Sequence, residues 1–305
     1  MDSADNSAPS IRDEHLPALF RSANTTSVTS QTRYLRLVRA VLTLLVAGAA
    51  LSAVSLTNSG LKTVVAILGL ILLIGSLCLT IFIYLNEFEK LWYGGRAVAE
   101  SVKTLAWRYM TRAEPFDAAL TPKKADGRLT KSLAEILTNR KHLAGIFGGD
   151  LGSAPQITDQ MREVRSLDTV TRKSIYLAQR IDGQRKWYSN KARDNQRAKG
   201  VWFAAVIVSQ GLALLAAAFL VAHPDSPVSL TGIFTTLASA FLAWMQLKRN
   251  QELAQSYGLA AHELGLIHAR GEHVQTEEEL SIYVSDAENA ISREHTLWVA
   301  RRDDV

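Results

Sequence analysis

Four stretches of the chain contain no Asp, Glu, Lys or Arg, and this feature constrains the fold more than any other. They are residues 40–56, 64–85, 201–222 and 230–247, and together they hold 79 of the 305 residues. All 63 charged residues lie in the rest of the chain. A soluble globular protein spreads its charges along the whole sequence, so this distribution argues against that class.

Each stretch is predicted to be a membrane-spanning helix, because a hydrocarbon core of about 30 Å needs about 20 helical residues. Residues 64–85 fit best, with 15 Leu, Ile, Val or Phe residues. Residues 230–247 hold only seven, and a buried helix of a soluble domain is the alternative for them. The connectors, residues 57–63 and 223–229, are short, so the four spans are expected to form two helical hairpins.

Lysine and arginine counts predict the orientation of the hairpins. The 20-residue flanks 20–39, 86–105, 181–200 and 248–267 carry fifteen of these residues, whereas the two connectors carry only Lys62. Lys and Arg accumulate on the cytoplasmic side of a membrane. We therefore expect a multi-pass protein of the cell's inner (plasma) membrane, partnered by the lipid bilayer, with both termini and the segment between the hairpins in the cytoplasm.

Composition excludes several other classes. The only cysteine, Cys78, lies inside an apolar stretch, which excludes a disulfide framework and a thiolate metal site. The first apolar stretch begins too late for a secretory signal, so none is expected. The net charge of +5 could suggest nucleic acid, but the basic residues crowd the apolar stretches, so no nucleic-acid partner is expected.

The segments outside the predicted spans show helical spacing of apolar residues and no alternating strand pattern. Asp168 is the expected N-cap of one of these helices. The first 30 residues are expected to be loose apart from a short element at residues 16–20. The prediction is an all-α integral membrane protein with two transmembrane hairpins and long cytoplasmic helices. Those helices are expected at residues 86–113, 131–143, 167–200 and 277–302, and from residue 248 onward.

The two halves of the chain carry a short internal echo. Each reads G-x-A-x-x-E shortly after a hairpin, from Gly95 to Glu100 and from Gly258 to Glu263. Together with the duplicated hairpins, the echo predicts two copies of one unit. The expected domains are residues 1–150 and 151–305, each with one two-span hairpin and cytoplasmic helices.

Three stretches resemble one known family of membrane effectors. They are LWYGGRAVAESVKTLAWRYM at residues 91–110, with AEPF at 113–116, then RIDGQRKWYSNKA at 180–192 and AENAISREHTLW at 287–298. They resemble the SLATT family (SMODS- and SLOG-associating two-transmembrane effector domains). The first half is similar to one subtype and the second half to another, so the chain is identified as two tandem copies.

The resemblance implies a membrane effector of a bacterial conflict or antiviral defence system. Such effectors are proposed to oligomerise and form a pore, or to disrupt the inner membrane, on a nucleotide-linked signal. The sequence shows no fused nucleotide-synthesising or SLOG sensor domain. A separately encoded signalling or sensor protein is therefore an expected partner, together with further copies of the chain.

Motifs for catalysis are weak. Zinc binding of the zincin type needs histidines at i and i+4, whereas His262 and His268 are six residues apart. The glycine-rich residues 145–153 lack the lysine of a P-loop. Glu100 and Glu263 could act as paired carboxylates, but helix packing or ion pairs are the favoured interpretation. No enzyme activity, catalytic residue, metal or cofactor is expected.

A dense basic run precedes the third apolar stretch. It could bind an acidic ligand, including a nucleotide at Arg180, Arg185 or Lys191. The favoured alternative is a cytoplasmic flank on anionic lipid, worth about 1 kcal/mol per residue near the surface. The run consists of Arg185, Lys186, Lys191, Arg193, Arg197 and Lys199.

Polar residues within the third and fourth stretches are the candidates for a membrane function. An amide in the middle of a span, such as that of Gln210, is costly unless it has a partner or faces water. These residues either pack a four-helix bundle or line a pore built from several chains. The candidates are Ser209, Gln210, Thr231, Thr235 and Ser239.

A second functional hypothesis is a membrane-anchored scaffold or sensor that recruits a cytoplasmic partner through its helices. The residues outside the four stretches are too many for simple connectors. Aromatic and charged positions are where such a partner would bind. The candidates are Glu100, Trp107, Tyr109, Arg180, Trp187, Tyr188 and Glu263.

The charge pattern predicts the result of a reporter experiment. Green fluorescent protein fused to either end of the chain is expected to fluoresce, and alkaline phosphatase fused at the same places to be inactive, because both ends are predicted to be cytoplasmic. Alkaline phosphatase placed in the connectors, at residues 57–63 or 223–229, should be active. Ends that report from opposite sides would contradict the predicted orientation.

Overall fold

A computed structural model describes residues 9–53, 58–139 and 154–303 of the chain. Within these ranges every regular element is a helix and no β-strand occurs. The all-α prediction is therefore confirmed for the part of the chain that the structure describes.

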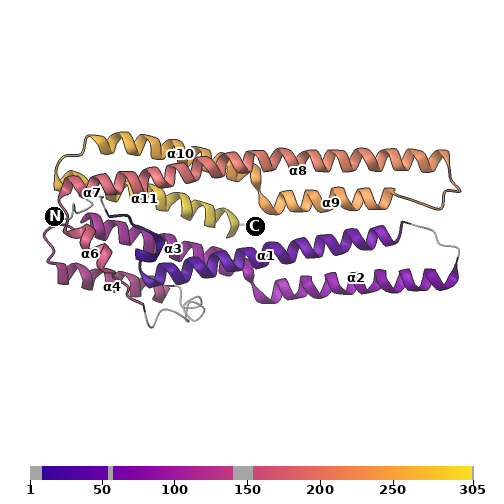
Figure 1. The fold of residues 1–305 in the computed structure, drawn as a ribbon, viewed down its shortest axis with the longest axis horizontal. Coiled ribbons are helices and arrows are strands. Elements are labelled where there is room, and N and C mark those ends of the chain that lie inside the picture. The colour runs from indigo at the N-terminus through magenta and orange to yellow at the C-terminus, as the bar shows by residue number, and fades with distance from the viewer. Residues whose placement is uncertain (1–8, 54–57, 140–153, 304–305) are drawn as a thin grey trace, which may run out of the picture. The chain divides into compact units, whose positions relative to one another are not determined.

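Figure 1 shows the helices, coloured by their position along the chain. One of them, η2, is a π-helical segment, and it continues α7 directly into α8. The elements are η1 (Asp13–His15), α1 (Ala18–Leu51), α2 (Ser59–Asn86), α3 (Phe88–Thr111), α4 (Pro122–Asn139), α6 (Asp159–Ser166), α7 (Thr169–Ile175), η2 (Tyr176–Asp182), α8 (Gly183–Ala222), α9 (Thr231–Lys248), α10 (Asn250–Glu272) and α11 (Glu277–Asp303).

The chain divides into two compact units, and each combines distant segments. Unit 1 consists of Met1–Ser30, Glu89–Ser189 and Tyr257–Val305. Unit 2 consists of Gln31–Phe88 and Asn190–Ser256. All four uncharged stretches lie in unit 2, so the division follows the charge pattern of the sequence.

The helices predicted outside the four apolar stretches are present as α3, α7 to α8, α10 and α11, and the N-cap prediction is confirmed. The Asp168 carboxylate accepts a hydrogen bond from the backbone N–H of Thr171 at 3.0 Å. The Thr171 hydroxyl also donates to this carboxylate, at 2.6 Å. The hydroxyl bond first and the backbone bond second lower the pKa of Asp168, because they favour the charged carboxylate. The weak pattern at residues 131–143 belongs to a longer helix, α4, which begins at Pro122; residues 140–143 and the glycine-rich segment 145–153 lie outside the described residues.

Each apolar helix pair is followed by a one-residue break rather than by a continuous helix. Glu87 separates α2 from α3 with φ 45°, and Arg249 separates α9 from α10 with φ 47°. Both are left-handed conformations that a residue with a side chain adopts rarely. A single residue in the left-handed conformation therefore ends α2 in the first half of the chain and α9 in the second half.

The short element expected at residues 16–20 is present, but the expectation that the rest of the first 30 residues is loose is wrong for residues 21–30, which continue it as helix α1. Leu16, Leu19 and Phe20 are at most 3% exposed in the core of unit 1, and α1 already begins at Ala18. The Gln156 side chain caps this helix by accepting from the backbone N–H of Leu19 at 3.0 Å. The polar composition of residues 21–30 concealed the continuation of this helix, in which Ala23, Ser27 and Ser30 are also buried.

The core of unit 1 draws on both halves of the sequence. Val102 and Met110 from α3, Tyr176 and Ile181 from η2, and Val284 from α11 all lie in one buried cluster. Ring contacts join these helices, as where Tyr176 meets Trp107 with centroids 5.8 Å apart and Tyr283 with centroids 6.1 Å apart. Unit 1 is therefore one bundle to which both halves contribute.

Unit 2 contains the apolar helices, whose side chains point mostly outward. Three helical ranges, Ala18–Leu51, Ser59–Thr111 and Thr169–Ala222, are long and apolar enough to cross a membrane. Their most apolar windows are only 0%, 6% and 17% buried. Exposed Leu and Ile side chains cost about 1.5–3 kcal/mol each relative to burial, so this surface requires a nonaqueous environment.

Helix α9, the fourth predicted span, is not among these three ranges. Its 18 residues extend about 27 Å at about 1.5 Å per residue, slightly less than a hydrocarbon core. Within unit 2 it packs on α8 through Trp202 and Trp244, whose rings are 6.1 Å apart, and on α1 through Arg39, which lies 4.8 Å from the Trp244 ring. Helices α1 and α2 also touch, since a Cβ on Gly75 would lie 3.7 Å from Leu44.

The two echo motifs have different surroundings in unit 1. A Cβ on Gly95 would lie 2.9 Å from the backbone oxygen of Ala23, whereas nothing lies within 4 Å of a Cβ on Gly258. The side chain of Glu100 is 11% exposed, and Glu263 is exposed. The motif therefore fixes a close approach between α3 and α1 in the first half, and the second half makes no such contact at Gly258.

This difference generates a matched pair of stability predictions. Gly95→Ala is expected to lower the midpoint of thermal unfolding, because overpacking costs about 1–3 kcal/mol and the obstacle is backbone. Gly258→Ala should leave it unchanged or raise it, since replacing glycine inside a helix stabilises by about 0.5–1 kcal/mol. Thermal unfolding of both variants in detergent measures the difference, and equal midpoints would show that the close approach is not rigid.

Candidate functional site

The centre of unit 1 holds a buried ion pair whose carboxylate accepts four hydrogen bonds. Arg180 donates to Glu288 from Nε and Nη2, both at 2.8 Å. The same carboxylate accepts from Thr104 Oγ1 at 2.8 Å and from the Tyr176 hydroxyl at 3.0 Å. Both charged side chains are at most 1% exposed. Three helical elements, α3, η2 and α11, are thereby tied together at one carboxylate.

The electrostatics of this centre favour its charged form. Burial by itself lowers the pKa of Arg180, but the adjacent Glu288 carboxylate more than reverses this and raises it. Burial also raises the pKa of Tyr176, and the negative charge of Glu288 raises it further. Both groups therefore stay protonated, and the carboxylate keeps its donors.

Two more arginines are buried where helices end. Arg165 Nη1 donates to the carbonyl oxygens of Tyr109 and Phe116 at 2.7 and 2.9 Å. Arg172 donates to the Thr111 carbonyl at 2.6 Å and is paired with Glu277. Carbonyls at the end of α3 lack intrahelical partners, so these guanidinium groups satisfy them.

The pKa of Glu277 reflects this pairing. Burial alone would raise it, but hydrogen bonds from Arg172 and Thr169 outweigh burial and lower the pKa. A carboxylate whose pKa is depressed by folding stabilises the fold above its ordinary pKa and loses that contribution as the pH falls. The contact between α11 and α7 is therefore expected to weaken in acid.

The sequence candidates for a cytoplasmic interaction fall mostly inside unit 1. Trp107, Tyr109 and Tyr188 are 1–2% exposed and belong to its core. The Tyr109 hydroxyl donates to Asp126 at 2.5 Å, and burial raises the pKa of Tyr109. Three of the proposed contact residues are thus occupied in packing, and only small parts of them are accessible.

The other candidates divide between the interior and the surface. Arg180 is buried in the ion pair described above. Glu100 pairs with Arg96 at 2.9 Å, and Trp187 is partly buried beside Tyr257 with ring centroids 5.5 Å apart. Glu263 is exposed on α10. Glu100 and Glu263 therefore differ in burial, and Glu100 has a partner of its own.

The polar candidates in unit 2 also separate by exposure. Ser209 is buried, with Val206 and Ala213 on the same face of α8. Gln210, Thr235 and Ser239 are exposed, and Thr231 is partly exposed. The Thr235 hydroxyl donates a hydrogen bond to the carbonyl of Thr231 at 2.9 Å, so this hydroxyl has a partner within its own helix. The exposed amide of Gln210 is the polar group that most needs an external partner.

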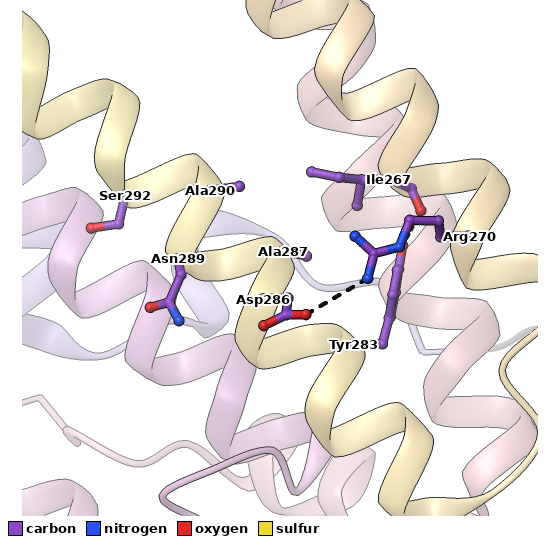
Figure 2. A pocket seen from close by; sticks show the side chains of 8 residues that line it. All are labelled: Ile267, Arg270, Tyr283, Asp286, Ala287, Asn289, Ala290 and Ser292. Atoms are coloured by element: carbon purple, nitrogen blue, oxygen red, sulfur yellow. Dashed lines mark hydrogen bonds and ion pairs between the residues drawn. The ribbon is translucent and has the colours of Figure 1, made fainter.

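Unit 1 also has a surface pocket of about 620 Å³ between α10 and α11. Figure 2 shows Arg270 of α10 reaching toward Asp286 of α11, beside the ring of Tyr283. The ion pair is 3.6 Å long, and the Tyr283 hydroxyl donates to the Ile267 carbonyl at 2.9 Å. No residue proposed from the sequence lines this pocket.

No group of three or more metal-ligating side chains occurs among the described residues. His268 lies 3.4 Å from Asp182 and 3.8 Å from Glu272, which gives it ion-pair partners when it is protonated. The prediction that the chain is not an enzyme remains a prediction.

Outward-facing apolar helices in one unit and a bundle with buried ion pairs in the other define a helical membrane protein. Two family models match it in tandem. Residues 17–173 match SMODS and SLOG-associating 2TM effector domain 3, and residues 176–298 match effector domain 1 of the same series. The chain therefore belongs to the SLATT family of two-transmembrane effector domains and carries two different subtypes, as the resemblance indicated.

Neither a curated protein sequence nor a solved structure matches the chain. The two matched ranges meet at the start of η2, the π-helical segment. The domain boundary predicted at residues 150 and 151 lies outside the described residues and stays a prediction. The shared core shows that the two matched halves fold together in unit 1 rather than as separate bodies there.

Several buried charged residues were missed in the sequence analysis. Glu288 follows Val284 by four positions and precedes Ile291 by three, which places a carboxylate on the apolar face of α11. Arg180 stands in the same relation to Tyr176. A single charge on an otherwise apolar helical face is the signal that would have predicted a buried pair. Arg165 and Arg172 were also missed: Arg165 donates to backbone carbonyls, and Arg172 donates to a backbone carbonyl and pairs with Glu277.

The buried pair predicts a large effect of one substitution. Glu288→Gln keeps the shape of the side chain but leaves the Arg180 charge uncompensated, and breaking a buried pair costs about 3–5 kcal/mol. Chemical unfolding in detergent, followed by tryptophan fluorescence, measures it. Glu263→Gln, at an exposed glutamate, is the control and should change stability by at most about 0.5 kcal/mol. Equal stability of the two variants would contradict the account of this centre.

Proposed function

We propose that the chain is an oligomeric effector of a bacterial conflict system, which forms a pore in the inner membrane in response to a signal. The first support for this proposal is the apolar surface of unit 2. The exposed apolar surface of unit 2 calls for a bilayer, and membership of a two-transmembrane family supports one hairpin per half. On this proposal α9 is the fourth span, and its length is nearly that of a hydrocarbon core.

The positions of the basic residues support the orientation of the hairpins, and the packing of unit 2 supports assembly of several chains. The Lys and Arg residues flank the hairpins outside their connectors, which supports cytoplasmic termini and a cytoplasmic bundle. A single chain is not expected to enclose a water-filled path, because small side chains such as Ser209 and Ala213 are buried in close packing within unit 2. A water path therefore requires several copies of the chain.

One observation carries the pore proposal: Gln210 is exposed near the middle of the longest apolar part of α8. An unpartnered amide in hydrocarbon is costly, so this position is expected to face either another chain or water. Thr235 and Ser239 are exposed on α9 and would add polar atoms to the same lining. Leucines elsewhere in the spans could close the path by dewetting.

The bundle of unit 1 is the proposed receiver of the signal. It contains an interlocked polar centre, and α1, α8 and α10 belong in part to this unit and in part to unit 2. A partner protein or a ligand that shifts these helices would act on the apolar segments of the same helices. The signal is expected from a separately encoded partner.

The test is inducible expression in bacteria together with the neighbouring genes, with a voltage-sensitive dye as the readout. The chain is expected to depolarise the cells, and Gln210→Leu to reduce depolarisation while the same amount inserts into the membrane. Gln246→Leu, which removes an exposed amide near the end of α9, is the matched control and should behave like the parent chain.

Two results would contradict the pore. One is an unchanged membrane potential in cells whose membranes contain the chain and its neighbours. The other is equal depolarisation by the parent chain and by Gln210→Leu. A chain that leaves membranes ion-tight but still retains a cytoplasmic partner would favour the alternative function, a membrane-anchored scaffold or sensor.

A further inference from the structure

The flanks of the apolar helices give unit 2 an excess of positive charge. Outside the two connectors, the segments of this unit carry nine Lys and Arg residues but only three Asp and Glu residues. The three carboxylates are those of Glu87, Asp194 and Glu252. Glu252 pairs with Arg249 at 2.8 Å, so it adds little to the neutralisation of the other basic side chains.

Three of the basic side chains come together from three helices. The Arg39 guanidinium of α1 lies 4.8 Å from the ring of Trp244 of α9. Lys248 follows Trp244 by four positions, on the same face of α9. The positive charges of Arg39 and of Lys191 on α8 both act on the Lys248 ammonium, and no carboxylate among the described residues offsets them there. We call Arg39, Lys191 and Lys248 the basic cluster.

Two tryptophans mark the depth of the basic cluster in a bilayer. Trp202 and Trp244 have ring centroids 6.1 Å apart, and both lie close to the charged flanks of their apolar stretches. Tryptophan is enriched where hydrocarbon meets the polar headgroups. Arg39 immediately precedes one apolar stretch, and Lys248 immediately follows another. A cluster at this depth faces phospholipid headgroups.

The basic cluster is open to an occupant from outside the chain. Arg39 and Lys191 are exposed, and Lys248 is partly exposed. Neither Arg39 nor Lys248 donates a hydrogen bond to, or forms an ion pair with, any residue that the structure describes. Their N–H donors are therefore available to an external acceptor. Because like charges held together repel one another, a bound anion would also stabilise this arrangement.

We infer that the basic cluster binds the phosphate group of an anionic phospholipid. An arginine can donate two parallel hydrogen bonds to a phosphate, and lysines contribute point charges. Basic pockets between membrane helices on the cytoplasmic side suit such headgroups. The acyl chains of the same lipid would cover exposed apolar side chains of the neighbouring helices, such as Leu45 of α1 and Leu242 of α9. A free phosphate offers the first set of contacts but not the second.

This site requires the bilayer and the orientation of the proposed function, but it does not depend on a pore. Native mass spectrometry of the full chain in a neutral detergent, with equal amounts of phosphatidylglycerol and phosphatidylcholine added, counts the lipids of each kind bound per chain. The first bound lipid is expected to be phosphatidylglycerol, preferred by at least about fivefold, since one nearby basic residue already favours an anionic lipid by about that factor. An excess of glycerol phosphate, which is the headgroup without acyl chains, should not displace it.

A matched pair of variants on α1 tests the position of the site. Arg39→Gln is expected to weaken the binding of phosphatidylglycerol about fivefold and to leave the binding of phosphatidylcholine unchanged. Arg33→Gln removes the same charge at an exposed position six residues away, on a different face of α1. It is the control, and its effect is expected to stay below about twofold, because distant exposed charges are screened.

A second pair on α8 is independent of the contact between Arg39 and Trp244. Lys191→Gln should weaken the binding of phosphatidylglycerol, whereas Arg193→Gln should have the smaller effect of a control. Both positions are exposed, but residues two positions apart do not face each other on a helix. Each variant removes one positive charge from the same turn, so a general attraction of the basic flank for anionic lipid predicts equal losses.

Three results would overturn the inference. Equal losses within either pair of variants would show a diffuse attraction rather than a site. Equal binding of the two lipids by the parent chain would show no preference for the anionic headgroup. Displacement by glycerol phosphate would assign the basic cluster to a free phosphate instead of a lipid. None of these measurements depends on membrane potential, so failure of this site and failure of the pore are distinguishable.

Discussion

Helices that expose Leu, Ile and Val over most of their surface are stable only where water is absent, and this constraint governs the whole molecule. The apolar windows of α1, α2 and α8 are almost entirely unburied by the chain itself, so lipid or another copy of the chain must cover them. The charged residues are then confined to the remaining segments, which must build a separate water-compatible bundle. The separation of charged from uncharged segments along the sequence therefore corresponds to the division of the structure into two units.

The bundle of unit 1 has a different organising interaction. One carboxylate, Glu288 of α11, binds an arginine and a tyrosine of η2 and a threonine of α3. Buried ion pairs are weak evidence for stability as such, since apolar replacements can be equally stable. Their geometric demands make this centre suited to holding several helices in a single register.

Much of this organisation could be predicted from the sequence. Absence of charge located the apolar helices, helical spacing located α3 and α11, and the Asp168 cap was correct to the residue. A short element at residues 16–20 was predicted, but its continuation through residues 21–30 was not, because polar residues such as Ser27 are buried there by contacts with distant segments. The left-handed breaks at Glu87 and Arg249 also carry no glycine or proline signal.

The candidate residues show the same limit. Aromatic and charged positions such as Trp107, Arg180 and Trp187 were selected individually, and the cavity that all three line depends on the packing of α3 against η2 and α8. Periodicity identifies the face of a helix on which a residue lies, but it does not identify the residues that will surround it. Glu288 lies in a stretch that resembled the family, and its position marks it as a buried charge, but its three hydrogen-bonding neighbours, Thr104, Tyr176 and Arg180, are evident only in the structure.

The most direct test of the account uses the single cysteine, Cys78, which is exposed on α2. A nitroxide attached there, in the chain reconstituted into liposomes, reports whether its surroundings are lipid or water. The account predicts strong relaxation by oxygen and protection from a water-soluble nickel complex, whereas a label on Lys131→Cys in a Cys78→Ser background should be open to nickel. Equal access of nickel to both labels would contradict a membrane-spanning α2 and, with it, the separation of the chain into a lipid-facing and a water-facing unit.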